Sequence, residues 1–215
     1  IRWKLYDQPE GRKIHSEPIP RLGGIAVAIA FSVPILALTL WDNDISTALF
    51  AERGLLISLV CGGGLILAVG IHDDLKGARA LTKLIGQITA AMIVYHAGVQ
   101  IDVIGIPFTG PVELGAWAFP VTIFWIVLVT NAINLIDGLD GLAGGVAVLA
   151  GATLFVMSVV EGNVVGALLI CSMVGATLGF LRFNWNPASI FLGDTGSLFL
   201  GFLLALSSTH GSQKS

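Results

Sequence analysis

Five aspartates stand at the ends of long apolar segments. They are Asp73, Asp74, Asp137, Asp140 and Asp194. A carboxylate at the edge of a membrane or in a deep core is costly unless a metal ion, a charged partner or water meets it. The placement of these side chains therefore indicates a site that uses negative charge.

The apolar segments themselves are typical of a polytopic membrane protein. Of the 215 residues, 55% are hydrophobic and only 12% are charged, whereas a soluble domain carries roughly 25% charged residues. The mean hydropathy is +0.88. A helix needs about 20 apolar residues to cross the hydrocarbon core of a bilayer. Seven segments are candidates for such helices: 23–41, 54–71, 81–97, 116–135, 142–160, 164–181 and 196–209. We therefore predict an all-α polytopic membrane protein in which residues 1–215 form a single transmembrane domain.

The distribution of basic residues predicts which side of the membrane each loop faces. If the chain alternates sides, the loops 1–22, 72–80, 136–141 and 182–195 share one face. Together with the adjoining Lys83, this face holds nine of the eleven basic residues: Arg2, Lys4, Arg12, Lys13, Arg21, Lys76, Arg79, Lys83 and Arg182. The positive-inside rule makes it the cytoplasmic face. On the opposite face, the alternation within 99–113 predicts a small β-hairpin.

All five aspartates come from loops on the predicted cytoplasmic face, so they are expected to converge. Like charges repel in a medium of low polarity, and a divalent cation relieves that repulsion. Magnesium suits the set because it binds a few carboxylates and completes its shell with phosphate oxygens. Basic residues on the same face could hold the rest of a polyphosphate. We expect Mg²⁺, or Mn²⁺ in its place, and a phosphate-bearing substrate.

Four stretches, in this order, carry a resemblance to a known family. They are RKIHSEPIPRLGGIAV, GIHDDLKGARALTKLIGQ, NAINLIDGLDGLAGG and FNWNPASIFLGDTGSLFLG. The chain resembles the polyprenyl-phosphate N-acetylhexosamine-1-phosphate transferases, of glycosyltransferase 4 type. The resemblance is closest to the undecaprenyl-phosphate N-acetylglucosamine-1-phosphate transferase branch. The phospho-N-acetylmuramoyl-pentapeptide transferase is a more distant relative.

The resemblance implies an enzyme of about ten or eleven helices in the bacterial cytoplasmic membrane, with its active site facing the cytoplasm. It would transfer a sugar-1-phosphate from a UDP-N-acetylhexosamine, by resemblance N-acetylglucosamine, to undecaprenyl phosphate and release UMP. This step would start a cell-envelope glycopolymer. By the same comparison the chain is expected to lack the first helix, several C-terminal helices and a histidine-rich loop.

The resemblance also implies roles for the acidic residues. Asp73 and Asp74 match a pair of catalytic aspartates, the first of which is proposed to act on the lipid phosphate. Asp194 matches a magnesium ligand, and Asp73 is expected to help it. Asp137 is placed in the catalytic set, and the residues after it, Gly138, Leu139 and Asp140, would face uridine.

Further residues are expected to bind substrate. Asn184 and Phe191 match positions near the uracil. Asn131 and Asn134 lie three residues apart, on one helix face with Asp137, and would contact metal or pyrophosphate. Four cationic or titratable side chains could contact phosphate or substrate: Lys76, Lys83, Arg21 and His15.

Several of these patterns also have structural explanations. Asp194 could be a helix N-cap, and the D-G pairs around Asp137 and Asp140 are typical of a tight turn. Phe191 could pack in the core, and the basic residues could be ordinary cytoplasmic charges. Intramembrane carboxylates and glycine-interrupted helices also occur in cation-coupled transporters.

The rival function is therefore a transporter. It would place some carboxylates near the middle of the bilayer, whereas these cluster at one face. No nucleic-acid-binding pattern is present. The choice of UDP-sugar, single or double displacement, the downstream pathway and a homodimer remain open at this stage.

Overall fold

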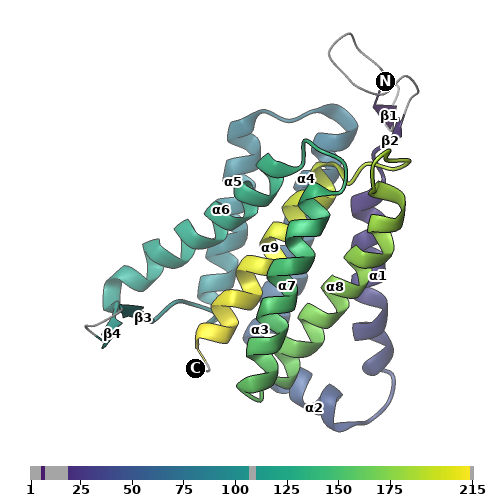
Figure 1. Ribbon diagram of the computed structural model, residues 1–215. Helices are drawn as coiled ribbons and strands as arrows, with labels where there is room; N and C mark the ends of the chain where they lie inside the picture. The colour runs from purple at the N-terminus through teal and green to yellow at the C-terminus, as the bar shows by residue number, and fades with distance from the viewer. Residues whose placement is uncertain (1–5, 8–18, 107–109, 214–215) are drawn as a thin grey trace.

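The computed structural model describes residues 6–7, 19–106 and 110–213 (Figure 1). The chain is mainly helical. The helices are α1 (Gly23–Leu38), α2 (Asp44–Ala51), α3 (Arg53–Ile57), α4 (Gly64–Lys76), α5 (Ala80–His96), α6 (Ala118–Ile136), α7 (Leu142–Val160), α8 (Val164–Asn184) and α9 (Gly193–Ser212). A π-helical segment, Ser58–Gly63, joins α3 to α4, and a 3-10 turn, Gly115–Trp117, precedes α6.

The α9 helix lies at the centre of the bundle. It packs against α1, α4, α6, α7 and α8. Every residue from Thr195 to Leu206 is buried, which means that neighbouring helices cover this stretch on all sides. Phe199 and Phe202, for example, are enclosed, and the Phe199 ring meets that of Phe31 of α1 edge-on at 5.6 Å between centroids. The first turn of α9 is therefore held by several helices at once.

The loops fall into two groups at opposite ends of the bundle, as the alternation of sides predicts. Figure 1 shows the start of α1, the α4–α5 connection, the α6–α7 turn and the α8–α9 loop together at one end. The α2 helix, the α7–α8 turn and the β3–β4 pair lie toward the other end. The three segments that carry the aspartates thus share one end.

The prediction of seven membrane-spanning helices is not confirmed. In the described part of the chain, four helices are long and apolar enough to cross a membrane: Arg53–Lys76, Gly115–Ile136, Leu142–Val160 and Val164–Asn184. The α1 helix is apolar but shorter. The α5 helix has only 17 residues and includes Lys83 and Gln87. The α9 helix has 20 residues, but Asp194, His210 and several hydroxyl side chains lower its mean hydropathy.

Two short antiparallel strand pairs accompany the helices. The pair β3 (Val103–Ile106) and β4 (Gly110–Glu113) lies within the region where a hairpin was predicted. The side of the membrane that it faces stays a prediction. The pair β1 (Tyr6–Asp7) and β2 (Ile19–Pro20) lies at the end of the bundle that carries the aspartates.

Glycines let α1 and α4 approach the start of α9 very closely. A Cβ atom added to Gly24 would lie 2.1 Å from the backbone nitrogen of Gly196, and one added to Gly70 would lie 2.5 Å from the Cα of Thr195. The amides of Gly23 and Gly24 donate to the carbonyls of Phe191 and Leu192 at 3.1 and 2.8 Å. No larger residue fits at these contacts without moving backbone.

We predict that Gly24→Ala lowers the thermal stability of the protein in detergent. Inserting a methyl group against backbone typically costs about 1–3 kcal/mol. Gly175→Ala in α8 is the matched control, because no atom lies within 4 Å of its added Cβ and alanine is the better helix former. Equal losses of stability in the two variants would contradict the close α1–α9 contact.

Candidate active site

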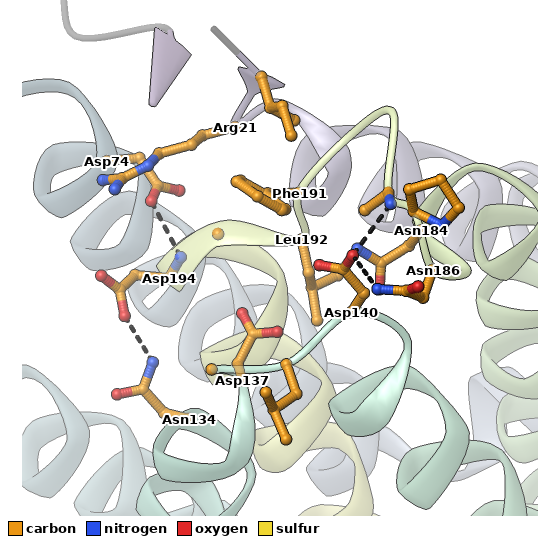
Figure 2. A pocket seen from close by; sticks show the side chains of 16 residues that line it. Arg21, Asp74, Asn134, Asp137, Asp140, Asn184, Asn186, Phe191, Leu192 and Asp194 are labelled. Carbon is orange, nitrogen blue, oxygen red and sulfur yellow. Dashed lines mark hydrogen bonds between the residues drawn. The ribbon is translucent and has the colours of Figure 1, made fainter. Parts of the chain in front are cut away.

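A cavity of about 510 Å³ opens among the loops at the end of the bundle that carries the aspartates. Its walls come from β2 and the residues just before α1, from α4, from the end of α6 with the α6–α7 turn, and from the α8–α9 loop with the first turn of α9 (Figure 2). The lining residues are Ile19, Arg21, Asp74, Asn134, Asp137, Gly138, Leu139, Asp140, Asn184, Asn186, Pro187, Ala188, Phe191, Leu192, Gly193 and Asp194. Segments far apart in the sequence therefore form one polar pocket.

The carboxylate of Asp74 binds the first turn of α9. It accepts hydrogen bonds from the backbone amides of Asp194 and Thr195, each at 2.9 Å, and from the Thr195 hydroxyl at 2.6 Å. Gly193 has a positive φ of 72°, and a Cβ there would lie 2.8 Å from Asp74 Oδ2. The conformation and the lack of space both require glycine at this position.

Asp194 itself projects into the pocket from this turn (Figure 2). The side-chain Nδ2 of Asn134 in α6 donates to Asp194 Oδ1 at 2.5 Å and to the Ser197 hydroxyl at 2.8 Å. The N-cap residue of α9 is Leu192, whose side chain makes no capping bond. The alternative of Asp194 as an N-cap is therefore wrong, because Asp194 lies inside the first turn and Asp74 supplies the capping bonds.

Lys83 in α5 connects two of the carboxylates. Its Nζ lies 2.7 Å from Asp73 Oδ2 and 3.4 Å from Asp194 Oδ1. The other oxygen of Asp73 accepts a hydrogen bond from the Ala78 amide. A single cationic group thus reaches both Asp73 and Asp194, which shows that the two carboxylates surround one small volume.

Asp137, directly after α6, lies in a different electrostatic environment. Burial raises the pKa of this carboxyl to about 8, and the negative charges of Asp194 and Asp74 add to the effect. Among the described residues no ion pair neutralises Asp137. Near Asp137, the pocket therefore contains more carboxyl groups than basic groups that could neutralise them.

Hydrogen bonds join the α6–α7 turn to the α8–α9 loop. Buried Asn184 accepts from the Gly141 amide and donates to the Ile190 carbonyl, each at 3.0 Å. Asp140 Oδ2 accepts from Asn186 Nδ2 and from the Ala188 amide, also at 3.0 Å. The predicted tight turn is present, with Gly141 at a positive φ of 72°. The turn and the loop form one wall of the pocket.

The pocket brings together ten of the predicted site residues. They are Arg21, Asp74, Asn134, Asp137, Gly138, Leu139, Asp140, Asn184, Phe191 and Asp194. The backbone amide of Phe191 donates to the carbonyl of Pro20, the residue before Arg21, at 2.9 Å. The Asn184 oxygen and one of its N–H groups already take part in bonds within this wall of the pocket.

Other predicted residues lie beside the pocket or away from it. Asp73 and Lys83 adjoin Asp194 without lining the cavity. Lys76 is exposed at the end of α4. His15 lies outside the described residues.

Asn131 bonds within the bundle rather than to the pocket. Its amide exchanges hydrogen bonds with Gln87 of α5 and donates to the Val127 carbonyl at 2.8 Å. Gln87, one helical turn after Lys83, is only 1% exposed. The pair satisfies the side-chain amides of buried Gln87 and half-buried Asn131 between α5 and α6. Nothing in this arrangement directs Asn131 toward a phosphate.

Asn186 is a pocket residue that the sequence did not single out. It lies in the NWNPAS part of the fourth stretch and bonds to Asp140. A pair of asparagines before a proline is a turn signal, but only the fold shows that the second one faces the α6–α7 turn.

The donor set fits a magnesium ion that retains other ligands. Among residues 6–7, 19–106 and 110–213, no three His, Cys, Asp or Glu side chains form a group that could hold a metal alone. Mg²⁺ typically takes one or two carboxylates together with water and substrate phosphates. Asp194 and Asp137 line the cavity, with Asp73 adjacent, so carboxylate ligands of the right kind and number are present.

Comparison of the sequence with known proteins shows the family of the chain. The model of Glycosyl transferase family 4 matches residues 56–212. A probable undecaprenyl-phosphate N-acetylglucosaminyl 1-phosphate transferase of Bacillus subtilis is 40% identical over 216 residues, covering 100% of this chain and 58% of the relative. A decaprenyl-phosphate N-acetylglucosaminephosphotransferase of Mycolicibacterium smegmatis is 36% identical, covering 97% of this chain and 54% of the relative.

A phospho-N-acetylmuramoyl-pentapeptide-transferase of Listeria monocytogenes is also similar, at 36% identity over 91% of this chain and 63% of the relative. The chain thus spans somewhat more than half the length of the curated relatives that it matches. The family match covers most of the chain, including α4 to α9 and the three quoted stretches that contain the aspartates. The chain belongs to glycosyl transferase family 4.

Proposed function

We propose that the protein transfers N-acetylglucosamine-1-phosphate from a UDP-sugar to undecaprenyl phosphate, with release of UMP. The reaction would use Mg²⁺ at the cytoplasmic face of a bacterial cytoplasmic membrane. The names of two relatives describe transfer of N-acetylglucosamine phosphate to a polyprenyl phosphate. The observation that carries the proposal is the convergence of Asp74, Asp137 and Asp194, from three separate segments, on one polar pocket.

The pocket residues suggest how a nucleotide sugar would lie. The wall formed by Gly138, Leu139 and Asp140 would contact uridine, with Phe191 beside the base. The pyrophosphate would then extend toward Asp194, where Arg21 and Lys83 supply positive charge. Bound Mg²⁺, held by Asp194 with Asp137 or Asp73, would neutralise charge on the pyrophosphate.

In the reaction that we propose, an oxygen of the lipid phosphate attacks the β-phosphorus of the UDP-sugar. The bond from that phosphorus to the bridging oxygen breaks, and UMP leaves with the oxygen. A phosphate monoester has a second pKa of about 6, so it is largely dianionic at neutral pH. It needs no base to remove a proton, so Asp73 and Lys83 would act mainly by orientation and charge.

A cation-coupled transporter is the second candidate, and the position of the acids favours the transferase. The five aspartates lie at one end of the bundle, and the α1 and α7 helices contain no charged residue. The polar pair of Gln87 in α5 and Asn131 in α6 is neutral. A transporter would be expected to place ionisable groups near the bilayer centre.

We predict that Asp194→Asn abolishes magnesium-dependent UMP release by the intact protein. The change keeps the size of the side chain but removes the charge that binds the cation. The assay incubates purified protein with undecaprenyl phosphate, Mg²⁺ and UDP-N-acetylglucosamine, and measures UMP and the lipid product. Other UDP-N-acetylhexosamines in the same assay identify the preferred sugar.

Asp102→Asn serves as the control for this experiment. Asp102 is exposed, bonds to Gln100 and lies far from the pocket. The activity of Asp102→Asn should therefore equal that of the wild type. Full activity in Asp194→Asn would remove the proposed ligand. Wild-type protein that forms no lipid product from any UDP-sugar would refute the transferase.

We predict that, in EDTA, the Asp137 carboxyl makes thermal stability fall as the pH rises from about 4 to about 8, and that this group causes no further fall above that range. Burial raises the pKa of Asp137 from its ordinary value of 3.8 to about 8 in the folded protein. Between these values the folded state holds a proton that the unfolded state has lost, so raising the pH destabilises the fold.

Added Mg²⁺ should weaken this dependence, because a cation favours the ionised carboxylate. Asp137→Asn should remove the same component of the pH profile, while Asp102→Asn should leave it in place. Identical pH profiles for the wild type and Asp137→Asn would contradict the assigned environment.

A further inference from the structure

We infer that Asp74 is a positioning residue, which fixes the first turn of α9 and thereby directs Asp194 into the pocket. This differs from the direct catalytic role expected for both aspartates of the pair. The inference rests on the proposed function only in taking Asp194 as the residue whose placement matters for catalysis.

The hydrogen bonds of Asp74 account for most of what its carboxylate can accept. Three donors meet it: the Asp194 amide, the Thr195 amide and the Thr195 hydroxyl. A carboxylate offers about four acceptor positions. Asp74 is only 7% exposed, and Gly193 leaves no room beside its oxygens, since an added Cβ atom would lie 2.8 Å from Oδ2. Little of the group is left for a metal or a phosphate.

These bonds satisfy a need that α9 cannot meet locally. The first four amides of a helix have no intrahelical acceptor, and an N-cap side chain usually supplies one. The N-cap residue here is Leu192, which has no polar group. Asp74 supplies the acceptors from α4, 120 residues earlier in the chain. A negative charge is also favourable beside a helix N-terminus.

The two neighbouring aspartates therefore have different tasks. Asp73 contacts Lys83 and the backbone amide of Ala78. Asp74 instead bonds to the backbone of α9. Glycines make the second contact possible, because a Cβ on Gly70 or Gly193 would collide with Thr195 or with Asp74 itself. Asp194 is then fixed twice, through its own amide by Asp74 and through its side chain by Asn134.

Thr195 offers a test that leaves every pocket side chain unchanged. Thr195→Val keeps the shape of the side chain but removes one donor to Asp74, and Thr195→Ser keeps that donor. Thr209→Val is the matched control: Thr209 is equally buried on α9, but its hydroxyl bonds only to the Ala205 carbonyl of the same helix.

The first measurement is hydrogen–deuterium exchange of peptides that cover residues 193–197 in the intact, detergent-solubilised protein. Asp74→Asn should speed exchange there by about tenfold or more, because hydrogen bonds to a charged acceptor are lost. Thr195→Val should show a smaller increase, and Thr195→Ser and Thr209→Val should match the wild type. Unchanged exchange in both Asp74→Asn and Thr195→Val would overturn the inference.

The second measurement is the Mg²⁺ concentration that gives half-maximal UMP release. Thr195→Val should raise it several-fold and Thr195→Ser should restore it, since a displaced Asp194 binds the ion less well. A wild-type Mg²⁺ dependence in Thr195→Val, with Asp74→Asn inactive but normally protected from exchange, would assign Asp74 a direct role instead. The exchange measurement needs no turnover, so failure of the proposed function would not be mistaken for failure of this inference.

Discussion

The hydrogen bonds between the Asp74 carboxylate and the first turn of α9 join two helices that are far apart in the sequence, and the pocket is built around that junction. The α9 helix is buried from Thr195 to Leu206, so its position is fixed by all the helices around it. At its N-terminus, Gly24 and Gly70 bring α1 and α4 into backbone contact with it. Because Asp194 belongs to this turn, the packing of the surrounding helices also fixes the position of its carboxylate.

Charge balance explains the rest of the site. Lys83 contacts Asp73 and Asp194, whereas Asp137 has a strongly raised pKa because it is buried near other carboxylates. A pocket of this kind favours any ligand that brings positive charge near Asp137 and Asp194. A divalent cation bound to a pyrophosphate satisfies that requirement and also brings an anion that Arg21 and Lys83 can contact. The repulsion between neighbouring carboxylates would therefore favour binding of a divalent cation.

The sequence was sufficient for the general architecture and for most of the pocket. Alternation of sides placed the acidic loops at one end, and the order of the four stretches indicated the family that the comparisons show. Whether α5 and α9 cross the bilayer was less predictable, since both mix apolar residues with groups such as Lys83 and His210. Hydropathy measures the composition of a helix, and it does not reveal that neighbouring helices enclose α9.

The bonding partners of individual polar side chains were the least predictable feature of the site. Spacing along α6 put Asn131 and Asn134 on one face, yet Asn134 bonds to Asp194 and Asn131 to Gln87. Likewise Asp73 and Asp74 are adjacent in sequence but face different helices. Such differences depend on the rotation and approach of neighbouring helices, which no local pattern encodes.

Binding of Mn²⁺ to the purified protein, measured by electron paramagnetic resonance in the presence of UDP-N-acetylglucosamine, tests the central claim most directly. The account predicts one bound ion per chain that Mg²⁺ displaces, and loss of this binding in Asp194→Asn. Mn²⁺ binding that is absent from the wild type, or that persists undiminished in Asp194→Asn, would contradict it.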